Sequence, residues 1–115
     1  MIRLVLLCQY GASTGMLAQR IKQAAAKNEI EISVDAYSYT DISKVVDKAD
    51  VILLGPQIRF KKAEFEKNYA SNGVPFVVIE TTDYGMMNGE NVLNSALEAL
   101  KQSKGESLWK TKVVF

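Results

Sequence analysis

A single cysteine, Cys8, precedes a loop that is rich in glycine and hydroxyl side chains. The loop reads Gln9-Tyr10-Gly11-Ala12-Ser13-Thr14-Gly15 and separates an apolar run from a segment with helical spacing. Backbone N–H dipoles at the start of a helix favour the thiolate, which is the nucleophilic form of cysteine. Glycines let successive N–H groups point inward, and Ser13 or Thr14 adds a hydroxyl, so a phosphoryl group on Cys8 would be surrounded by donors. This pattern predicts phosphoryl transfer through Cys8.

The alternative interpretation is that Cys8 is a small buried hydrophobe and that Ser13 and Thr14 merely cap a helix. Cysteine outside disulfides is among the residue types most often buried, which favours that interpretation for an arbitrary cysteine. Here the glycines and hydroxyls come directly after a cysteine that ends an apolar run. This combination favours a functional role for Cys8 over a purely structural one.

The composition of the chain excludes several kinds of partner and of catalytic chemistry. The chain has 115 residues, enough for one domain with its own core, and 48% of them are hydrophobic. A net charge of +1 argues against nucleic acid or an anionic membrane surface as a partner. Because the sequence contains no histidine, histidine bases and histidine metal ligands are excluded, and we expect no metal and no cofactor.

The sequence also indicates where the protein works. One cysteine cannot close an internal disulfide, which fits a reducing compartment. No segment approaches the roughly 20 apolar residues of a membrane span, and the apolar run before Cys8 is too short for an export signal. We therefore expect a cytoplasmic protein with no direct membrane insertion.

Strand-like and helix-like segments alternate four times along the chain. The predicted strands are residues 2–7, 29–36, 51–54 and 74–79. The predicted helices are residues 16–27, 40–48, 59–69 and 92–100, with a loop over residues 81–89 before the last helix. This alternation is typical of an α/β three-layer sandwich with a parallel sheet and helices on both faces.

The strand patterns predict the order of the sheet. Residues 2–7 and 51–54 are almost continuously apolar, as in strands buried on both faces. Residues 29–36 instead alternate, with Glu29 and Glu31 on the polar face, as expected of an edge strand. With right-handed crossovers the four-stranded order is 2-1-3-4, and ligands bind such folds at the carboxyl ends of strands one and three.

Two further loops leave carboxyl ends of predicted strands. Gly55-Pro56-Gln57 follows the third strand, and Asp83-Tyr84-Gly85-Met86-Met87-Asn88-Gly89 precedes the last helix. Alone, the first could be a strand stop and the second a long turn with two core methionines. Arg59 could face a phosphoryl group or a partner, although a solvated surface arginine is the commoner case.

Together, the three loops resemble the IIB components of the bacterial sugar phosphotransferase system (PTS), in the lactose/cellobiose family that includes chitobiose. The matching segments are residues 2–7 with Cys8-x-x-Gly11-x-Ser13-Thr14, residues 49–57 ending in Gly-Pro-Gln, and residues 83–89. The resemblance covers residues 1–102. Residues 103–115, with Trp109, extend past the family's usual end as a docked strand, an interaction segment or a remnant of cloning.

The resemblance implies a protein phosphohistidine–sugar phosphotransferase with a phosphocysteine intermediate. Cys8 would take the phosphoryl group from phosphohistidine on a IIA partner, and residues 9–15 would hold the phosphoryl oxygens. The group would then pass to a β-glucoside or disaccharide such as cellobiose, chitobiose or lactose in the membrane transporter IIC. Both partners would cover one rim, formed by Gln9, Tyr10, Gln57, Arg59, Tyr84 and Met86. The bulky Gln9-Tyr10 pair departs from the small residues that relatives often have there.

Other classes compete with this interpretation. A low-molecular-weight cysteine phosphatase needs Cys-x5-Arg to clamp the phosphoryl oxygens, and Thr14 stands at that position, with Asp83 an unsupported candidate acid. A flavin-binding electron carrier has a similar hydroxyl-rich loop, but this chain is short for one and its Cys8 would be unexplained. A response-regulator-like protein needs clustered aspartates where Cys8 lies.

Overall fold

The computed structural model describes residues 1–9 and 14–113. Its strands are β1 (Ile2–Cys8), β2 (Ile32–Ser38), β3 (Val51–Leu54) and β4 (Phe76–Val78). The α-helices are α1 (Thr14–Lys27), α2 (Ile42–Val45), α3 (Lys62–Asn68), α4 (Thr81–Gly85) and α5 (Gly89–Val113). Short 3₁₀ segments are η1 (Tyr39–Asp41), η2 (Val46–Lys48), η3 (Pro56–Lys61) and η4 (Ala70–Asn72).

The four strands form one parallel sheet in the order β2-β1-β3-β4, which confirms the predicted topology. In the register of β1 with its neighbours, Cys8 lies opposite Ser38, and Leu7 lies opposite Leu54. The chain therefore winds one way from β1 to β2 and the other way from β1 to β3. The carboxyl ends of these strands form the edge at which folds of this kind bind ligands.

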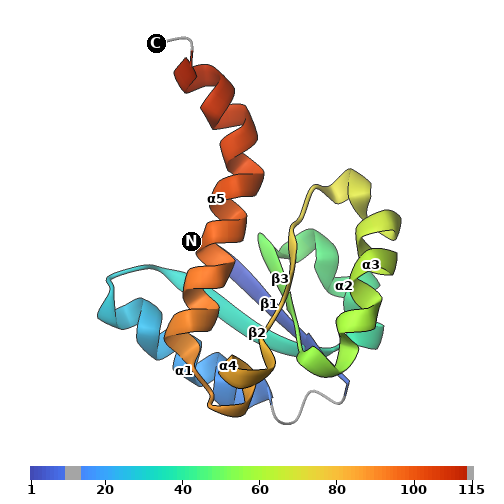
Figure 1. The fold of residues 1–115 in the computed structure, drawn as a ribbon, viewed down its shortest axis with the longest axis vertical. Coiled ribbons are helices and arrows are strands. Elements are labelled where there is room, and N and C mark those ends of the chain that lie inside the picture. The colour runs from blue at the N-terminus through green and yellow to red at the C-terminus, as the bar shows by residue number, and fades with distance from the viewer. Residues whose placement is uncertain (10–13, 114–115) are drawn as a thin grey trace.

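Helices cover both faces of the sheet, as Figure 1 shows with α1 and α5 on one side and α2 and α3 on the other. Successive strand residues point to opposite faces, so Leu6 packs against α1 and α5 while Leu7 packs against the α2 and α3 side. Both leucines are fully buried. Burial of each leucine side chain stabilises the fold by about 1.5–3 kcal/mol. Strand β1 therefore contributes side chains to the hydrophobic core on each face of the sheet.

Several elements differ from the sequence predictions. The helix predicted over residues 40–48 is a single α-turn, α2, between η1 and η2. The helix predicted over residues 59–69 starts as η3, in which Ile58 has non-helical angles (φ −118°, ψ 23°), and becomes α-helical only at Lys62. In both cases buried apolar side chains, Ile42 and Val45 in one and Ile58 in the other, fix the turn against the sheet.

The loop predicted over residues 81–89 contains helix α4. Its turn is closed by the Tyr84 amide, which donates to the Glu80 carbonyl at 2.9 Å, and Tyr84 and Met87 both pack against the core under α1 and α5. The helix ends where Met87 adopts a left-handed conformation (φ 53°). The prediction of a loop was therefore wrong for Thr81–Gly85, which form α4.

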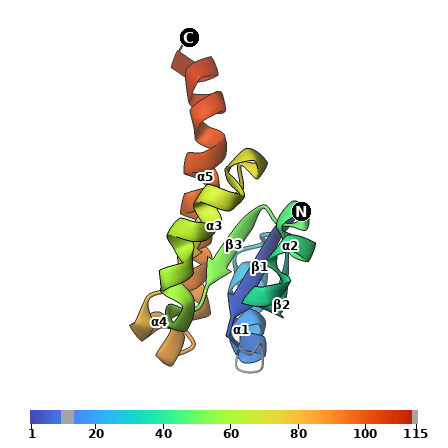
Figure 2. The same cartoon turned by 90° about the vertical axis from the view of Figure 1, so that its right-hand side faces the viewer.

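Helix α5 is much longer than predicted. Its first turns bury Val92, Leu93 and Ala96, and its backbone stays helical through Val113, so for residues 103–113 the predicted option of a docked strand is wrong. Figures 1 and 2 both show the carboxyl-terminal half of α5 projecting past the sheet. The boundary at residue 102 stays a prediction, because α5 crosses it without a break. Within the described residues no helix is long and apolar enough to cross a bilayer.

The start of α5 approaches α1 so closely that only glycine fits between them. A Cβ atom added to Gly89 would overlap the Arg20 carbonyl and lie 2.7 Å from the Ile21 amide nitrogen. These are backbone atoms in the middle of a helix, so they cannot yield as a flexible side chain would. Gly89 therefore sets the distance between the two helices that cover the Cys8 side of the sheet.

We predict that Gly89→Ala lowers the free energy of unfolding by about 1–3 kcal/mol, because the added methyl group forces the helices apart. Gly85→Ala is the matched control, since an added Cβ there meets no atom within 4 Å. Urea unfolding followed by circular dichroism measures both variants. Equal midpoints for the two variants would contradict the packing argument.

Candidate active site

Cys8 is the last residue of β1 and lies at the carboxyl edge of the sheet. On one side its register partner is Ser38, the last residue of β2. On the other side Gly55 directly follows β3, and its amide donates to the Leu7 carbonyl at 2.9 Å. The side chain of Cys8 is only 3% exposed. A reacting group must therefore approach through the residues that surround this strand end.

The alternation along β1 decides which helix Cys8 faces. Leu4 and Leu6 pack under α1 and α5, so Cys8, two residues further on, lies on the same face. Helix α1 begins at Thr14 at the same edge of the sheet and has no acidic residue in its first turn. The amino terminus of a 14-residue helix and the thiol thus share one face and one edge. Cys8 therefore lies at the edge of the sheet where the positive end of the α1 dipole is found.

The phosphoryl-binding loop predicted from the sequence is only partly within the described residues. Gln9 is an exposed residue directly after β1, and Gly15 is exposed in the first turn of α1. Thr14 opens α1. Tyr10, Gly11, Ala12 and Ser13 lie outside the described residues, so their roles stay predictions.

Because Gly55 has no side chain, it leaves a space that Cys8 and Gln57 both border. A Cβ atom added to Gly55 would lie 2.9 Å from Gln57 Oε1 and 3.6 Å from Cys8 Cβ. The backbone angles of Gly55 (φ −60°, ψ 151°) suit any residue, so a larger residue here would conflict only with the present position of the Gln57 side chain. The end of the Gln57 side chain therefore lies next to Gly55, beside the strand end that carries Cys8, although the sequence placed Gln57 only on the partner rim.

An open groove of about 640 Å³ lies beside the end of β3. It brings together three of the predicted rim residues, Gln57, Arg59 and Tyr84, from segments that follow two different strands. The groove is completed by Pro56, Phe60, Thr81 and Gly85. Met86 is not part of it: this side chain is 77% exposed and lines a separate hollow with Arg20 and Lys27 of α1.

Phe60 lines the groove, although the sequence analysis did not single it out. It falls within the helix predicted over residues 59–69 but lies in η3, and it is 71% exposed beside Gln57 and Arg59. Lys61 lies over both its ring and that of Tyr39, with Nζ 6.0 Å and 5.7 Å from the ring centroids. A phenylalanine shortly after a predicted strand is visible in the sequence. Its exposure could not be predicted without knowing that α3 begins only at Lys62.

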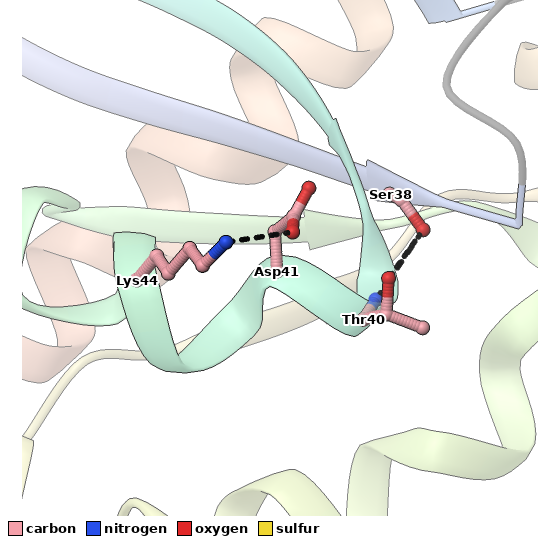
Figure 3. A network of polar contacts seen from close by, with 4 residues as sticks. All are labelled: Ser38, Thr40, Asp41 and Lys44. Carbon is pink, nitrogen blue, oxygen red and sulfur yellow. Dashed lines mark hydrogen bonds and ion pairs between the residues drawn. The ribbon is translucent and has the colours of Figure 1, made fainter.

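The turn after β2 was also overlooked, and Figure 3 shows its polar contacts. The Ser38 hydroxyl accepts a hydrogen bond from the Thr40 amide at 3.4 Å and lies 3.0 Å from the Thr40 hydroxyl. Lys44 Nζ lies 3.9 Å from Asp41 Oδ1, an exposed pair that contributes well under about 1 kcal/mol. These hydroxyl contacts start η1 directly beside Cys8. They hold the turn after β2 in place on the side of Cys8 that is opposite to Gly55.

Comparison with known proteins agrees with this geometry. The chain is 41% identical over 98 residues to the galactose-specific EIIB component of Lactococcus lactis subsp. cremoris, covering 81% of this chain and 91% of that protein. It matches the solution structure of the cellobiose-specific IIB protein of Borrelia burgdorferi with 42% identity and a TM-score of 0.74, over 89% of this chain and 94% of that one.

The lactose-specific IIB domain of Streptococcus pneumoniae shares the fold, with a TM-score of 0.77 at 21% identity, over 85% of this chain and 96% of that one. Residues 3–95 match the family model described as "PTS system, Lactose/Cellobiose specific IIB subunit". The chain belongs to the lactose/cellobiose-specific IIB subunits of the sugar phosphotransferase system.

Proposed function

We propose that Cys8 is the phosphoryl carrier of this IIB subunit, taking the group from phosphohistidine on a IIA partner and passing it to a sugar in the membrane transporter IIC. The observation that carries the proposal is the position of Cys8 between Ser38 and Gly55, on the face and at the edge where α1 begins. A helix amino terminus favours a thiolate and an attached phosphoryl dianion alike.

The two transfers are in-line displacements at phosphorus. In the first, the Cys8 thiolate forms the S–P bond while the P–N bond breaks, and the imidazole nitrogen keeps the electron pair and gains a proton from solvent. In the second, a sugar hydroxyl forms the O–P bond and loses its proton, and the electron pair of the S–P bond returns to Cys8. Positioning and charge stabilisation supply the rate, because no group on this chain needs to change its bonding except sulfur.

The sugar site belongs to the transporter in this proposal. The relatives named above are described for galactose, cellobiose and lactose. We infer a β-glucoside or disaccharide of the cellobiose, chitobiose or lactose type for this chain, with a cytoplasmic site of action where IIA and IIC can both be reached.

The direct test is Cys8→Ser. The variant should fold as the wild type does, because serine is similar in size at a position that ends a strand, yet it should accept no phosphoryl group from phosphorylated IIA. Intact-protein mass spectrometry measures the added phosphoryl mass. Phosphorylation of Cys8→Ser at the wild-type level would place the carrier residue elsewhere.

Partner docking is the second prediction. Among the described residues, Met16, Phe60 and Met86 are large exposed apolar side chains in segments that follow strand ends at the Cys8 edge. Exposed aromatic side chains are favoured anchors of interfaces. Phe60→Ser should slow transfer from phosphorylated IIA at least about tenfold at subsaturating IIA, with unchanged unfolding stability. Phe60→Leu, which keeps an apolar contact, should recover most of the rate, whereas a wild-type rate in Phe60→Ser would exclude Phe60 from docking.

The third prediction separates carrier from phosphatase. A cysteine phosphatase needs an arginine clamp, which Thr14 replaces in this chain. Phosphorylated Cys8 should therefore persist in buffer and discharge quickly only with membranes that hold the cognate transporter and its sugar. Steady hydrolysis of an aryl phosphate, lost in Cys8→Ser, would support the phosphatase instead.

A further inference from the structure

The Gln57 side-chain amide and Cys8 both lie beside Gly55 at the carboxyl edge of the sheet. Gln57 Oε1 and Cys8 Cβ lie 2.9 Å and 3.6 Å from the same point, which a side chain at position 55 would occupy. Both atoms therefore border the space that a side chain at position 55 would fill. They come from segments 49 residues apart, brought together by the pairing of β1 with β3.

The amide is also available for a new contact. Gln57 is exposed, and within residues 1–9 and 14–113 its side-chain amide has no hydrogen-bond partner. A half-turn of the terminal amide brings Nε2 to the position that Oε1 holds, and Nε2 carries two donor hydrogens. A phosphoryl group on Cys8 carries two negative charges and three acceptor oxygens, so an adjacent N–H donor has a strong partner.

We propose that Gln57 is a catalytic residue for both transfers, with Nε2 donating a hydrogen bond to an oxygen of the phosphoryl group on Cys8, and that Gly55 is the glycine that makes this contact possible. The proposal rests on the proposed function for the identity of the anion. During each displacement the donor stays on the same oxygen while the S–P bond forms or breaks, so no proton leaves Gln57.

A substitution of Gly55 offers a second way to disrupt the proposed contact between Gln57 and the phosphoryl group. A methyl group at this position would lie too close to Gln57 Oε1, at 2.9 Å, but at ordinary van der Waals distance from Cys8 Cβ, at 3.6 Å. Gly55→Ala is therefore expected to displace the Gln57 amide and leave Cys8 in place. Any effect of Gly55→Ala on the transfer rate should therefore result from displacement of the Gln57 amide.

The test uses the full chain in four variants, Gln57→Ala, Gln57→Glu, Gly55→Ala and the double variant Gly55→Ala/Gln57→Ala. The first measurement is the single-turnover rate of transfer from phosphorylated IIA at saturating IIA. We expect Gln57→Ala and Gly55→Ala each to slow it about 10- to 100-fold, as for a lost hydrogen bond to a charged group. The double variant should be no slower than Gln57→Ala, because both changes remove one contact.

The second measurement needs no partner protein. Iodoacetate and iodoacetamide alkylate the same thiolate with the same leaving group, but only iodoacetate carries a negative charge. Their rate ratio at Cys8 reports how the site treats an anion, and any change in thiolate fraction cancels. Gln57→Glu should lower the ratio about tenfold by replacing a donor with a carboxylate. The charge-matched control is Gln102→Glu on α5, where Gln102 contacts Glu98 and the next residue contacts Gly73, before β4 at the other end of the sheet; it should leave the ratio unchanged.

The outcomes separate the two claims. Wild-type transfer rates in Gln57→Ala with an unchanged alkylation ratio in Gln57→Glu would overturn the role of Gln57 and leave the carrier function intact. Additive losses in the double variant would also overturn it, because Gly55→Ala would then act by another route. If wild-type protein accepts no phosphoryl group, the proposed function fails, and the alkylation ratio alone decides whether Gln57 faces an anion at Cys8.

Discussion

In a parallel sheet all strands end at one edge, and the pairing of β1 with β3 is the contact that puts Cys8 and Gly55 side by side there. The Gly55 amide continues this pairing past the strand by donating to the Leu7 carbonyl at 2.9 Å. A shift of one residue would turn Cys8 to the face of α2 and α3, away from the start of α1. Leu6 and Leu7, fully buried in opposite cores, oppose any such shift, so the packing of the whole domain maintains the site.

The candidate site combines a buried cysteine with exposed surroundings. Cys8 is held by the sheet and is nearly inaccessible, whereas Gln57, Arg59 and Phe60 stand exposed on the 3₁₀ segment that follows β3. A carrier benefits from both properties. Burial limits the access of water to a phosphoryl group, and exposed side chains can adjust when a partner covers the edge. Gly89, by fixing the distance between α5 and α1, keeps in place the helix that begins at the Cys8 edge of the sheet.

The sheet could be predicted because its signals are periodic. Continuous apolar runs marked β1 and β3 as central, and the alternation before Ala36 marked β2 as an edge strand. The segments between strands could not be predicted well, since the packing of single residues, such as the buried Ile58 and the half-buried Tyr84, decides whether a turn becomes a helix. For the same reason the role of Gly55 and the exposure of Phe60 were not visible in the sequence. Both depend on distances between strand ends that only the folded chain defines.

The central claim is that one edge of the sheet carries the phosphoryl group, and a comparison of amide ¹H–¹⁵N spectra before and after phosphorylation tests it directly. The account predicts that the shifted amides belong to residues that follow the strand ends at this edge, namely Gln9, Gly15, residues 39–41, residues 55–60 and residues 80–85. Amides at the opposite edge, such as Asp50 beside Arg3 and Gly73 before β4, should not move. Shifts centred on Asp50 and Gly73, with the Cys8 edge unchanged, would contradict the account.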